Sequence, residues 1–98
     1  MNTMPELHLD AEYWISADDV YNAFFAVVQA PAWHGRNLDA LNDSIGTGGI
    51  NGIEVPYRLI ICNTSKAAPD ALRLLRPIVE LIYRLKTEGC PVEIKLVD

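Results

Sequence analysis

Residues 33–43, Trp-His-Gly-Arg-Asn-Leu-Asp-Ala-Leu-Asn-Asp, have the pattern of a tight loop that leads into a short helix. Asn37 is a suitable N-cap, because its side-chain oxygen can accept from the free backbone N–H groups two or three residues later. Gly35 precedes it and allows a turn that a residue with a Cβ atom would resist. Three apolar residues then recur at helical spacing and predict one buried face, formed by Leu38, Leu41 and Ile45.

The other face of this expected helix is polar and carries Asp39, Asn42 and Asp43. Asp39 lies in the first turn, where the positive end of the helix dipole favours a carboxylate, but Asp43 lies near the negative end. Two exposed like charges at this spacing cost roughly 0.2–0.5 kcal/mol. One interpretation is a solvated face on which Arg36 partly neutralises Asp39. The other is an anionic patch that is kept for a cationic partner.

Upstream of this stretch, the sequence predicts a strand and then a helix. Leu7 and Leu9 alternate with polar residues, which is typical of a strand with one buried face. The helix is expected to begin after the N-cap Ser16 and to stop at Pro31. Its apolar stripe consists of Val20, Phe24, Val27 and Val28.

Downstream, the continuous apolar run at residues 59–62 suits a strand covered on both faces. A helix is expected from Ala71 to the C′ residue Gly89, with a kink or a late start at Pro77, because proline removes one hydrogen bond. The last strand has its apolar side in Val92, Ile94 and Leu96. Strands that alternate with helices predict right-handed crossovers and a parallel α/β sheet, within a single domain of residues 1–98.

Two motifs that can indicate phosphate binding or acid–base catalysis have simpler explanations here. The glycine-rich loop at residues 46–52 follows a helix, whereas a phosphate-binding loop opens one. Asp39 and Asp43 would share nearly the same environment, whereas catalytic acid–base pairs work in environments that push their pKa values apart. Neither motif therefore predicts an enzyme.

The cysteines and histidines likewise predict no metal site. Cys62 ends one expected strand and Cys90 precedes the next, so in a parallel sheet the thiols lie at opposite ends and stay unbridged. His8 is interpreted as a residue on the solvent side of its strand, and His34 as a contact residue of a binding surface. His8 and His34 do not supply a recognisable set of zinc ligands.

The charge of the chain is unevenly distributed. The net charge is −5, and residues 1–55 hold eight acidic residues against Arg36 alone. The acidic field is therefore expected on the half that carries Asp39 and Asp43, where it would repel nucleic acid and attract a basic protein. The sequence has no apolar run long enough for a membrane span and no secretory signal pattern, so a cytoplasmic protein is expected.

The stretch around the two aspartates resembles the signature of the barstar family, intracellular inhibitors of ribonucleases of the barnase type. The resemblance covers nearly the whole chain and includes Pro31, Gly35, residues 37–41, Asp43, Lys86 and residues 88–90. It implies a three-stranded parallel sheet in the order 1-2-3, with helices packed on it. It also implies an inhibitor or immunity protein that places an acidic helix in the active site of a basic toxin, first of all a ribonuclease.

The surface that would contact the partner is expected to comprise Trp33, His34, Gly35, Arg36, Asn37, Asp39, Asn42, Asp43 and Arg84. Asn42 stands where the family has a tryptophan, and Arg36 and Arg84 stand where it has glutamates, which puts inhibition of barnase itself in question. We expect no cofactor, no metal, no catalytic residue and a monomer before binding. The alternatives are a regulatory interaction module that uses the same acidic helix and, third, a small-molecule enzyme.

Overall fold

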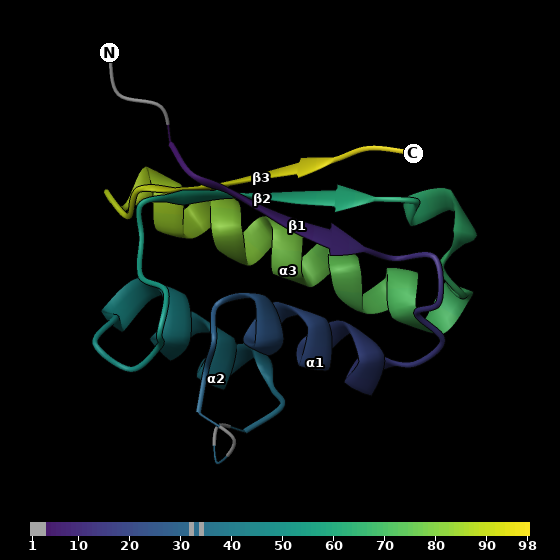
Figure 1. Cartoon of the computed structure of the whole chain (residues 1–98), viewed down its shortest axis with the longest axis horizontal. Coiled ribbons are helices and arrows are strands. Elements are labelled where there is room, and N and C mark those ends of the chain that lie inside the picture. Colours follow the sequence, from purple (N-terminus) through teal and green to yellow (C-terminus); the bar gives the residue numbers. More distant parts are fainter. Residues whose placement is uncertain (1–3, 32, 34) are drawn as a thin grey trace.

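The computed structural model describes residues 4–31, 33 and 35–98 of the 98-residue chain. Strands and helices follow one another as the sequence predicts (Figure 1). They are β1 (Glu6–Asp10), α1 (Ala17–Val27), α2 (Leu38–Asn42), a π-helical turn (Asp43–Thr47), β2 (Tyr57–Cys62), a 3-10 turn (Thr64–Lys66), α3 (Pro69–Thr87) and β3 (Val92–Leu96). None of the helices described is long and apolar enough to span a membrane.

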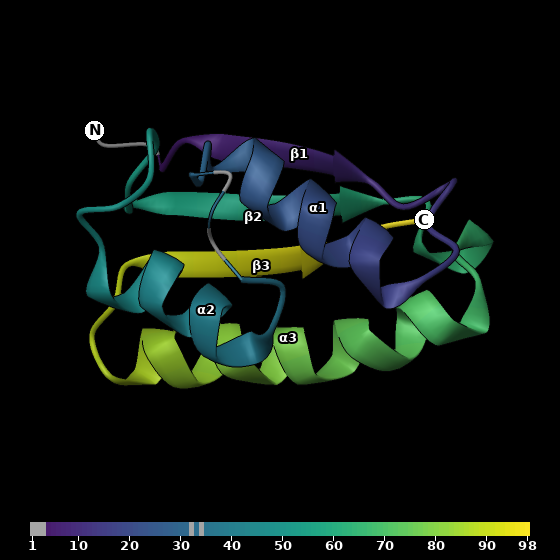
Figure 2. The same cartoon turned by 90° about the horizontal axis from the view of Figure 1, so that it is seen from below.

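The three strands form a parallel sheet in the order β1-β2-β3, which confirms the expected fold class. Leu7, Leu59 and Ile94 lie side by side in its register. Figures 1 and 2 show that the helices all cover the same face of the sheet. The core lies between the sheet and these helices, and it includes the fully buried side chains of Phe24 and Tyr57.

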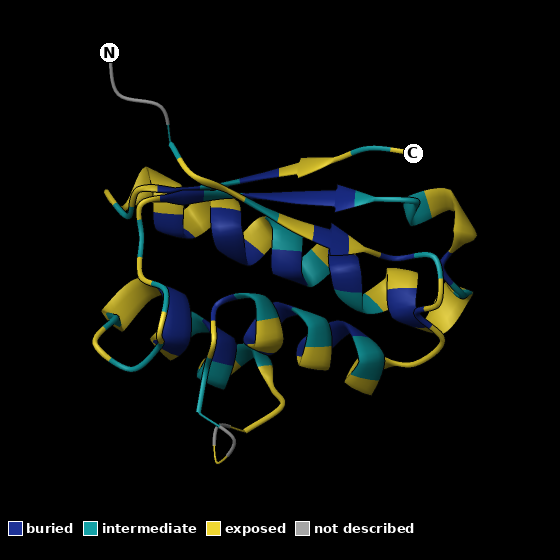
Figure 3. Ribbon diagram, viewed as in Figure 1, coloured by how far each residue is buried: buried dark blue, intermediate teal, exposed yellow. Residues whose placement is uncertain are grey.

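The expectation that β2 is covered on both faces is wrong, because no helix lies over the second face of the sheet (Figures 1 and 3). Ile60 points to that face but is only 9% exposed. Its neighbours in register are His8 and Lys95, whose long side chains flank it. Residues of the flanking strands therefore shield Ile60, and an apolar run alone cannot distinguish this from a covering layer. His8 itself is exposed on this face, as the sequence predicts.

Helix α1 begins as the sequence predicts but ends earlier. The Ser16 hydroxyl accepts from the Asp19 N–H while the Asp19 carboxylate accepts from the Ser16 N–H, a reciprocal capping box. The helix ends at Val27, and Gln29 adopts a left-handed conformation with φ of 58°. Pro31 is therefore not the residue that stops the helix.

Helix α3 also differs from expectation at one end. It begins at Pro69, two residues before Ala71, and runs through Pro77 without a late start. Pro69 suits the first turn, where a backbone N–H would have no partner within the helix. The helix ends as predicted, because Gly89 has a φ of 99° and its N–H donates to the Lys86 carbonyl.

Cys62 and Cys90 are free, as predicted. Cys62 closes β2, whereas Cys90 precedes β3, whose first residue Val92 pairs with Tyr57 at the opposite end of β2. The parallel register thus holds the two thiols at opposite ends of the sheet.

Candidate functional site: the α2 surface and its clefts

Helix α2 is a short element that is held by a side-chain cap and by burial of its apolar side. The Asn37 Oδ1 atom accepts from the Ala40 N–H over 2.7 Å, which confirms the predicted N-cap. Leu41 and Ile45 are buried, and Leu38 packs partly against the core. The cap and the buried face together orient the polar side of α2 toward solvent.

The α-helical pattern does not continue to Ile45 as the spacing suggests. After Asn42 the helix widens into the π-helical turn, in which the Gly48 N–H donates to the Asp43 carbonyl over 3.2 Å. A Cβ atom at Gly46 would lie 2.8 Å from Leu85, so this turn packs closely against α3. Asp43 therefore lies at the junction between two helix types.

Gly35 lies close to the capping side chain. A Cβ atom there would lie 3.1 Å from Asn37 Nδ2 and 4.0 Å from the Ala40 Cβ. The glycine therefore leaves room for the N-cap. The predicted turn at Gly35 stays a prediction, because it involves His34, which lies outside the described residues.

Asp39 and Asp43 are exposed carboxylates without a partner in the part of the chain that the structure describes. Nine of the thirteen acidic side chains accept a hydrogen bond or form an ion pair with another residue. The four that have no partner among the described residues are Asp18, Asp39, Asp43 and Glu88. Asp39 and Asp43 thus lie within one turn of each other on the exposed side of α2 and the start of the π-helical turn, which we call the α2 surface.

Arg36 does not neutralise Asp39, contrary to one of the two interpretations. Its Nε donates to the Asn22 Oδ1 on α1, so the guanidinium bridges the loop to the first helix. The expected Arg36–Asp39 pair is therefore wrong, whereas the exposure of Asp39 agrees with both interpretations of this face.

The structure brings three of the expected site residues together between α2 and α3. Arg84 Nη2 donates to Asn42 Oδ1 over 3.3 Å. The two residues border a cleft of about 530 Å³ that Asp39 also lines. The complete lining is Leu38, Asp39, Asn42, Pro77, Glu80, Leu81 and Arg84.

A second cleft, of about 510 Å³, lies beside the π-helical turn. Asn42 borders both clefts, and Glu88 and Cys90 line the second. The Cys90 thiol donates to the Ile45 carbonyl, and burial raises its pKa, so it is a poor candidate for a nucleophile.

Sequence reasoning missed Glu80 and Glu88 as residues of this surface. Each lies four positions from Arg84, Glu80 within α3 and Glu88 as its C-cap residue, so helical spacing places all three on one side. That spacing was the available signal. Only the packing of α2 against α3 shows that this face borders Asp39.

The remaining expected site residues lie in the loop before α2. Trp33 is in a turn and is 75% exposed. His34 lies outside the described residues, so the prediction for it stays untested. Trp33 and α2 are thus close in the sequence, and the large exposed indole lies in the connection that leads to the two carboxylates.

The acidic residues of the first half are partly compensated by cations from the second half. Parallel pairing of β1 with β2 brings Glu6 to 3.2 Å from Arg58. Glu12 lies 3.4 Å from Lys66. Cations from the second half of the sequence therefore pair with two acids of the first half, whereas Asp39 and Asp43 have no such pair among the described residues.

The glycine-rich loop holds an internal anion. The Glu54 carboxylate accepts from the N–H groups of Gly49 and Asn51, over 2.6 and 3.0 Å. The loop amides that a phosphate would need are therefore occupied by the chain's own carboxylate. Among the residues described, no group of three or more His, Cys, Asp or Glu side chains is placed to hold a metal ion.

Comparison with known proteins agrees with this geometry. A comparison with curated proteins found no match. The family model described as Barstar (barnase inhibitor) matches residues 4–96, which is almost the entire chain. This chain, with its parallel three-stranded sheet and its helices on one face, belongs to the barstar family.

Proposed function

We propose that this protein is an inhibitor or immunity protein that blocks the active site of a basic ribonuclease toxin with the α2 surface. The observation that carries the proposal is the pair of exposed, unpaired carboxylates of Asp39 and Asp43. Membership of a family of barnase inhibitors supports a partner of this kind.

The chemistry of such a partner explains why the two carboxylates stay unpaired. An enzyme that binds RNA phosphates presents Lys, Arg or His side chains in its cleft, and a carboxylate can take the place of a phosphate there. Charge-assisted hydrogen bonds to those cations are short and about twice as strong as neutral ones. A carboxylate that was already paired within its own chain would lose that pairing on binding. Asp39 and Asp43 are free of this cost.

Two cations distinguish the proposed binding surface from a uniformly acidic one. Arg36 is anchored to Asn22, and Arg84 is anchored to Asn42 between the two clefts. Neither guanidinium has an ion pair with another described residue. The proposed toxin therefore presents cations opposite Asp39 and Asp43 and also an acceptor opposite Arg84.

The test is capture of the toxin with the tagged protein from the cell that produces it, followed by a ribonuclease assay on the captured partner. Asp43→Ala should weaken binding by roughly 2 kcal/mol or more, because it leaves a buried cation of the partner unpaired. Asp18→Ala is the matched control, because it removes the same charge from an exposed, unpaired carboxylate on α1.

Thermal melts of both variants separate binding from stability. Asp43 lies one turn from Asp39, so its removal should leave the melting temperature unchanged or slightly raised. A captured partner without nuclease activity would favour a regulatory interaction module. Equal affinity of Asp43→Ala and Asp18→Ala for an active nuclease would contradict the proposed surface.

A further inference from the structure

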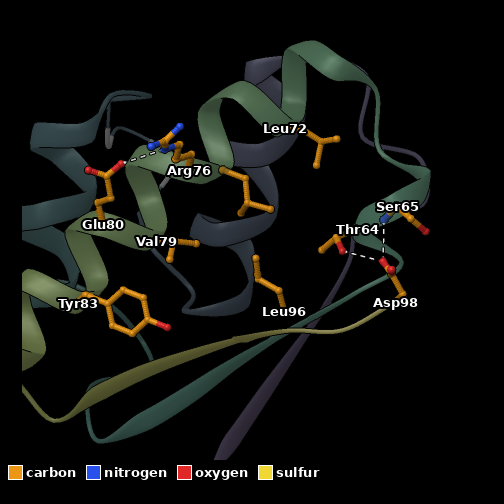
Figure 4. A pocket seen from close by; sticks show the side chains of 10 residues that line it. Thr64, Ser65, Leu72, Arg76, Val79, Glu80, Tyr83, Leu96 and Asp98 are labelled. Carbon is orange, nitrogen blue, oxygen red and sulfur yellow. Dashed lines mark hydrogen bonds and ion pairs between the residues drawn. The ribbon is translucent and has the colours of Figure 1, made fainter.

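An apolar groove of about 690 Å³ lies on the flank of α3 that faces away from α2 (Figure 4). Its walls are α3 on one side and the end of β3 on the other. Three of the six large hydrophobic side chains that are exposed among the described residues line it: Leu72, Tyr83 and Leu96. Val79 and the buried Leu75 also line the groove, so its apolar surface is continuous with the hydrophobic core.

The β3 wall of the groove is a free sheet edge. The Tyr57 N–H donates to the Pro91 carbonyl and the Val97 N–H donates to the Ile61 carbonyl. In a parallel ladder, every second residue of a strand points its backbone N–H and C=O groups to the same neighbouring strand. Residues 91, 93, 95 and 97 therefore face β2, while the backbone groups of Ile94 and Leu96 point outward.

The groove thus combines an apolar wall with a row of backbone donors and acceptors, and none of the described strands pairs with this row. A purely apolar ligand would leave these backbone groups without partners, which is costly when water is displaced. An added strand satisfies both walls, because its backbone pairs with the edge while alternate side chains point at the apolar surface.

We propose that this groove binds an extended peptide segment of another protein, which adds a strand beside β3. The segment would pair with the backbone of Ile94 and Leu96. Apolar residues at alternate positions would fill the space between Leu72, Val79 and Tyr83. The other alternate positions would face solvent and can be polar.

A second copy of this chain does not suit the groove. Helix α3 extends beyond β3 on the side of the free edge, as Figure 2 shows. An edge-to-edge dimer through β3 would bring a second α3 into the same space. An isolated extended segment has no such helix.

The groove and the α2 surface lie on two flanks of the same helix. Leu72, Arg76, Val79 and Tyr83 line the groove, whereas Pro77, Leu81 and Arg84 line the cleft toward α2. Glu80 borders both, and it is paired with Arg76 over 3.5 Å. The peptide and a partner on α2 can therefore bind at the same time, and the proposal does not depend on the proposed function.

The probe is a displayed library of random twelve-residue peptides, selected on the purified protein. We expect enrichment of sequences with apolar residues at alternate positions. On binding of a selected peptide, amide hydrogen exchange of Ile94 and Leu96 should slow at least tenfold. Asp43→Ala should bind the same peptide with unchanged affinity.

The decisive variant is Leu96→Pro with Leu96→Ala as its matched control. Both remove the leucine side chain, but only proline removes the outward N–H, and the ladder with β2 does not use that group. Affinity should fall at least tenfold more for Leu96→Pro than for Leu96→Ala. Tyr83→Glu is the second variant, for use if Leu96→Pro does not fold. It places a charge on the exposed part of the groove and is also expected to weaken peptide binding.

Several outcomes would overturn the proposal. These are a selection without alternating apolar residues, binding that Leu96→Pro and Tyr83→Glu leave intact, and unchanged exchange of Ile94 and Leu96. A concentration-dependent dimer that Leu96→Pro abolishes would assign the edge to a second copy instead.

Discussion

Arg84 on α3 donates to Asn42 on α2, two residues separated by 42 positions in the sequence, and this contact joins the two clefts. It places a cation in the cleft that the carboxylates of Asp39 and Glu80 also line. Glu80 and Glu88 lie four positions on either side of Arg84, and Glu88 lines the second cleft. We therefore expect Arg84 to influence which charged partner this surface binds.

Replacing Arg84 with Glu should improve binding to barnase, because the surface that faces a basic cleft becomes more acidic. The same change should lower the free energy of unfolding by about 0.5–1 kcal/mol, because the new carboxylate lies one turn from both Glu80 and Glu88. Titration calorimetry with barnase and urea unfolding measure the two effects. Arg84→Gln, which removes the cation without adding an anion, should lie between the wild type and Arg84→Glu. An unchanged affinity of Arg84→Glu for barnase would show that Arg84 does not select the partner.

Asn37→Ala should destabilise the protein by about 1 kcal/mol, since the Ala40 N–H loses its side-chain acceptor. The loss should extend to binding through α2, because this cap holds the short helix that carries Asp39. Asn37→Ser keeps a capping oxygen and should retain most of the stability. Urea unfolding of the three proteins gives the comparison, and equal stability of the alanine and serine variants would contradict a role for the cap.

Tyr57→Phe should stabilise the protein by about 1 kcal/mol. Tyr57 is fully buried, and its hydroxyl has no hydrogen-bond partner among the described residues. Burial, with Cys90 and Glu54 nearby, raises the pKa of this phenol far above its ordinary value. Removing an unsatisfied buried hydroxyl avoids its desolvation cost. Tyr83→Phe, at an exposed site, should change the unfolding free energy very little, and a destabilised Tyr57→Phe would indicate that the hydroxyl is hydrogen-bonded in solution.

Glu93 should contribute to loss of stability in acid. Its carboxylate accepts from Arg58 Nε over 3.0 Å and lies 3.2 Å from Lys86 Nζ. Hydrogen bonds from Arg58 and then Lys86 hold the pKa of this carboxyl below its ordinary value of 4.5. A pKa lowered by folding stabilises the protein above the ordinary value, and this contribution is lost as the pH falls through the folded pKa.

The test compares urea midpoints of the wild type and Glu93→Gln between about pH 6 and pH 3. The wild type should lose more stability across this interval than the variant, which is less stable at neutral pH but has no charge to lose at this position. Parallel curves for the two proteins would show that Glu93 has the same pKa in the folded and unfolded states.

Local patterns in the sequence determined the elements of this fold. Ser16 and Asn37 cap helices, and Gly89 ends one, because each acts on backbone groups within a few residues of itself. The alternation of Leu7 and Leu9 and the helical spacing of Leu38 and Leu41 likewise depend only on neighbours in the chain. The family resemblance extended this to the strand order.

Only the tertiary structure decided how charges and faces meet. Arg36 contacts Asn22 rather than Asp39, and Arg84 reaches Asn42, because helix packing sets which side chains of distant segments come within hydrogen-bonding distance. Ile60 is buried on an open sheet face by residues of neighbouring strands. The groove beside Leu96 exists because α3 lies beyond the sheet edge. Local periodicity reports which residues are buried, but the partner that buries or pairs each one depends on contacts between segments far apart in the sequence.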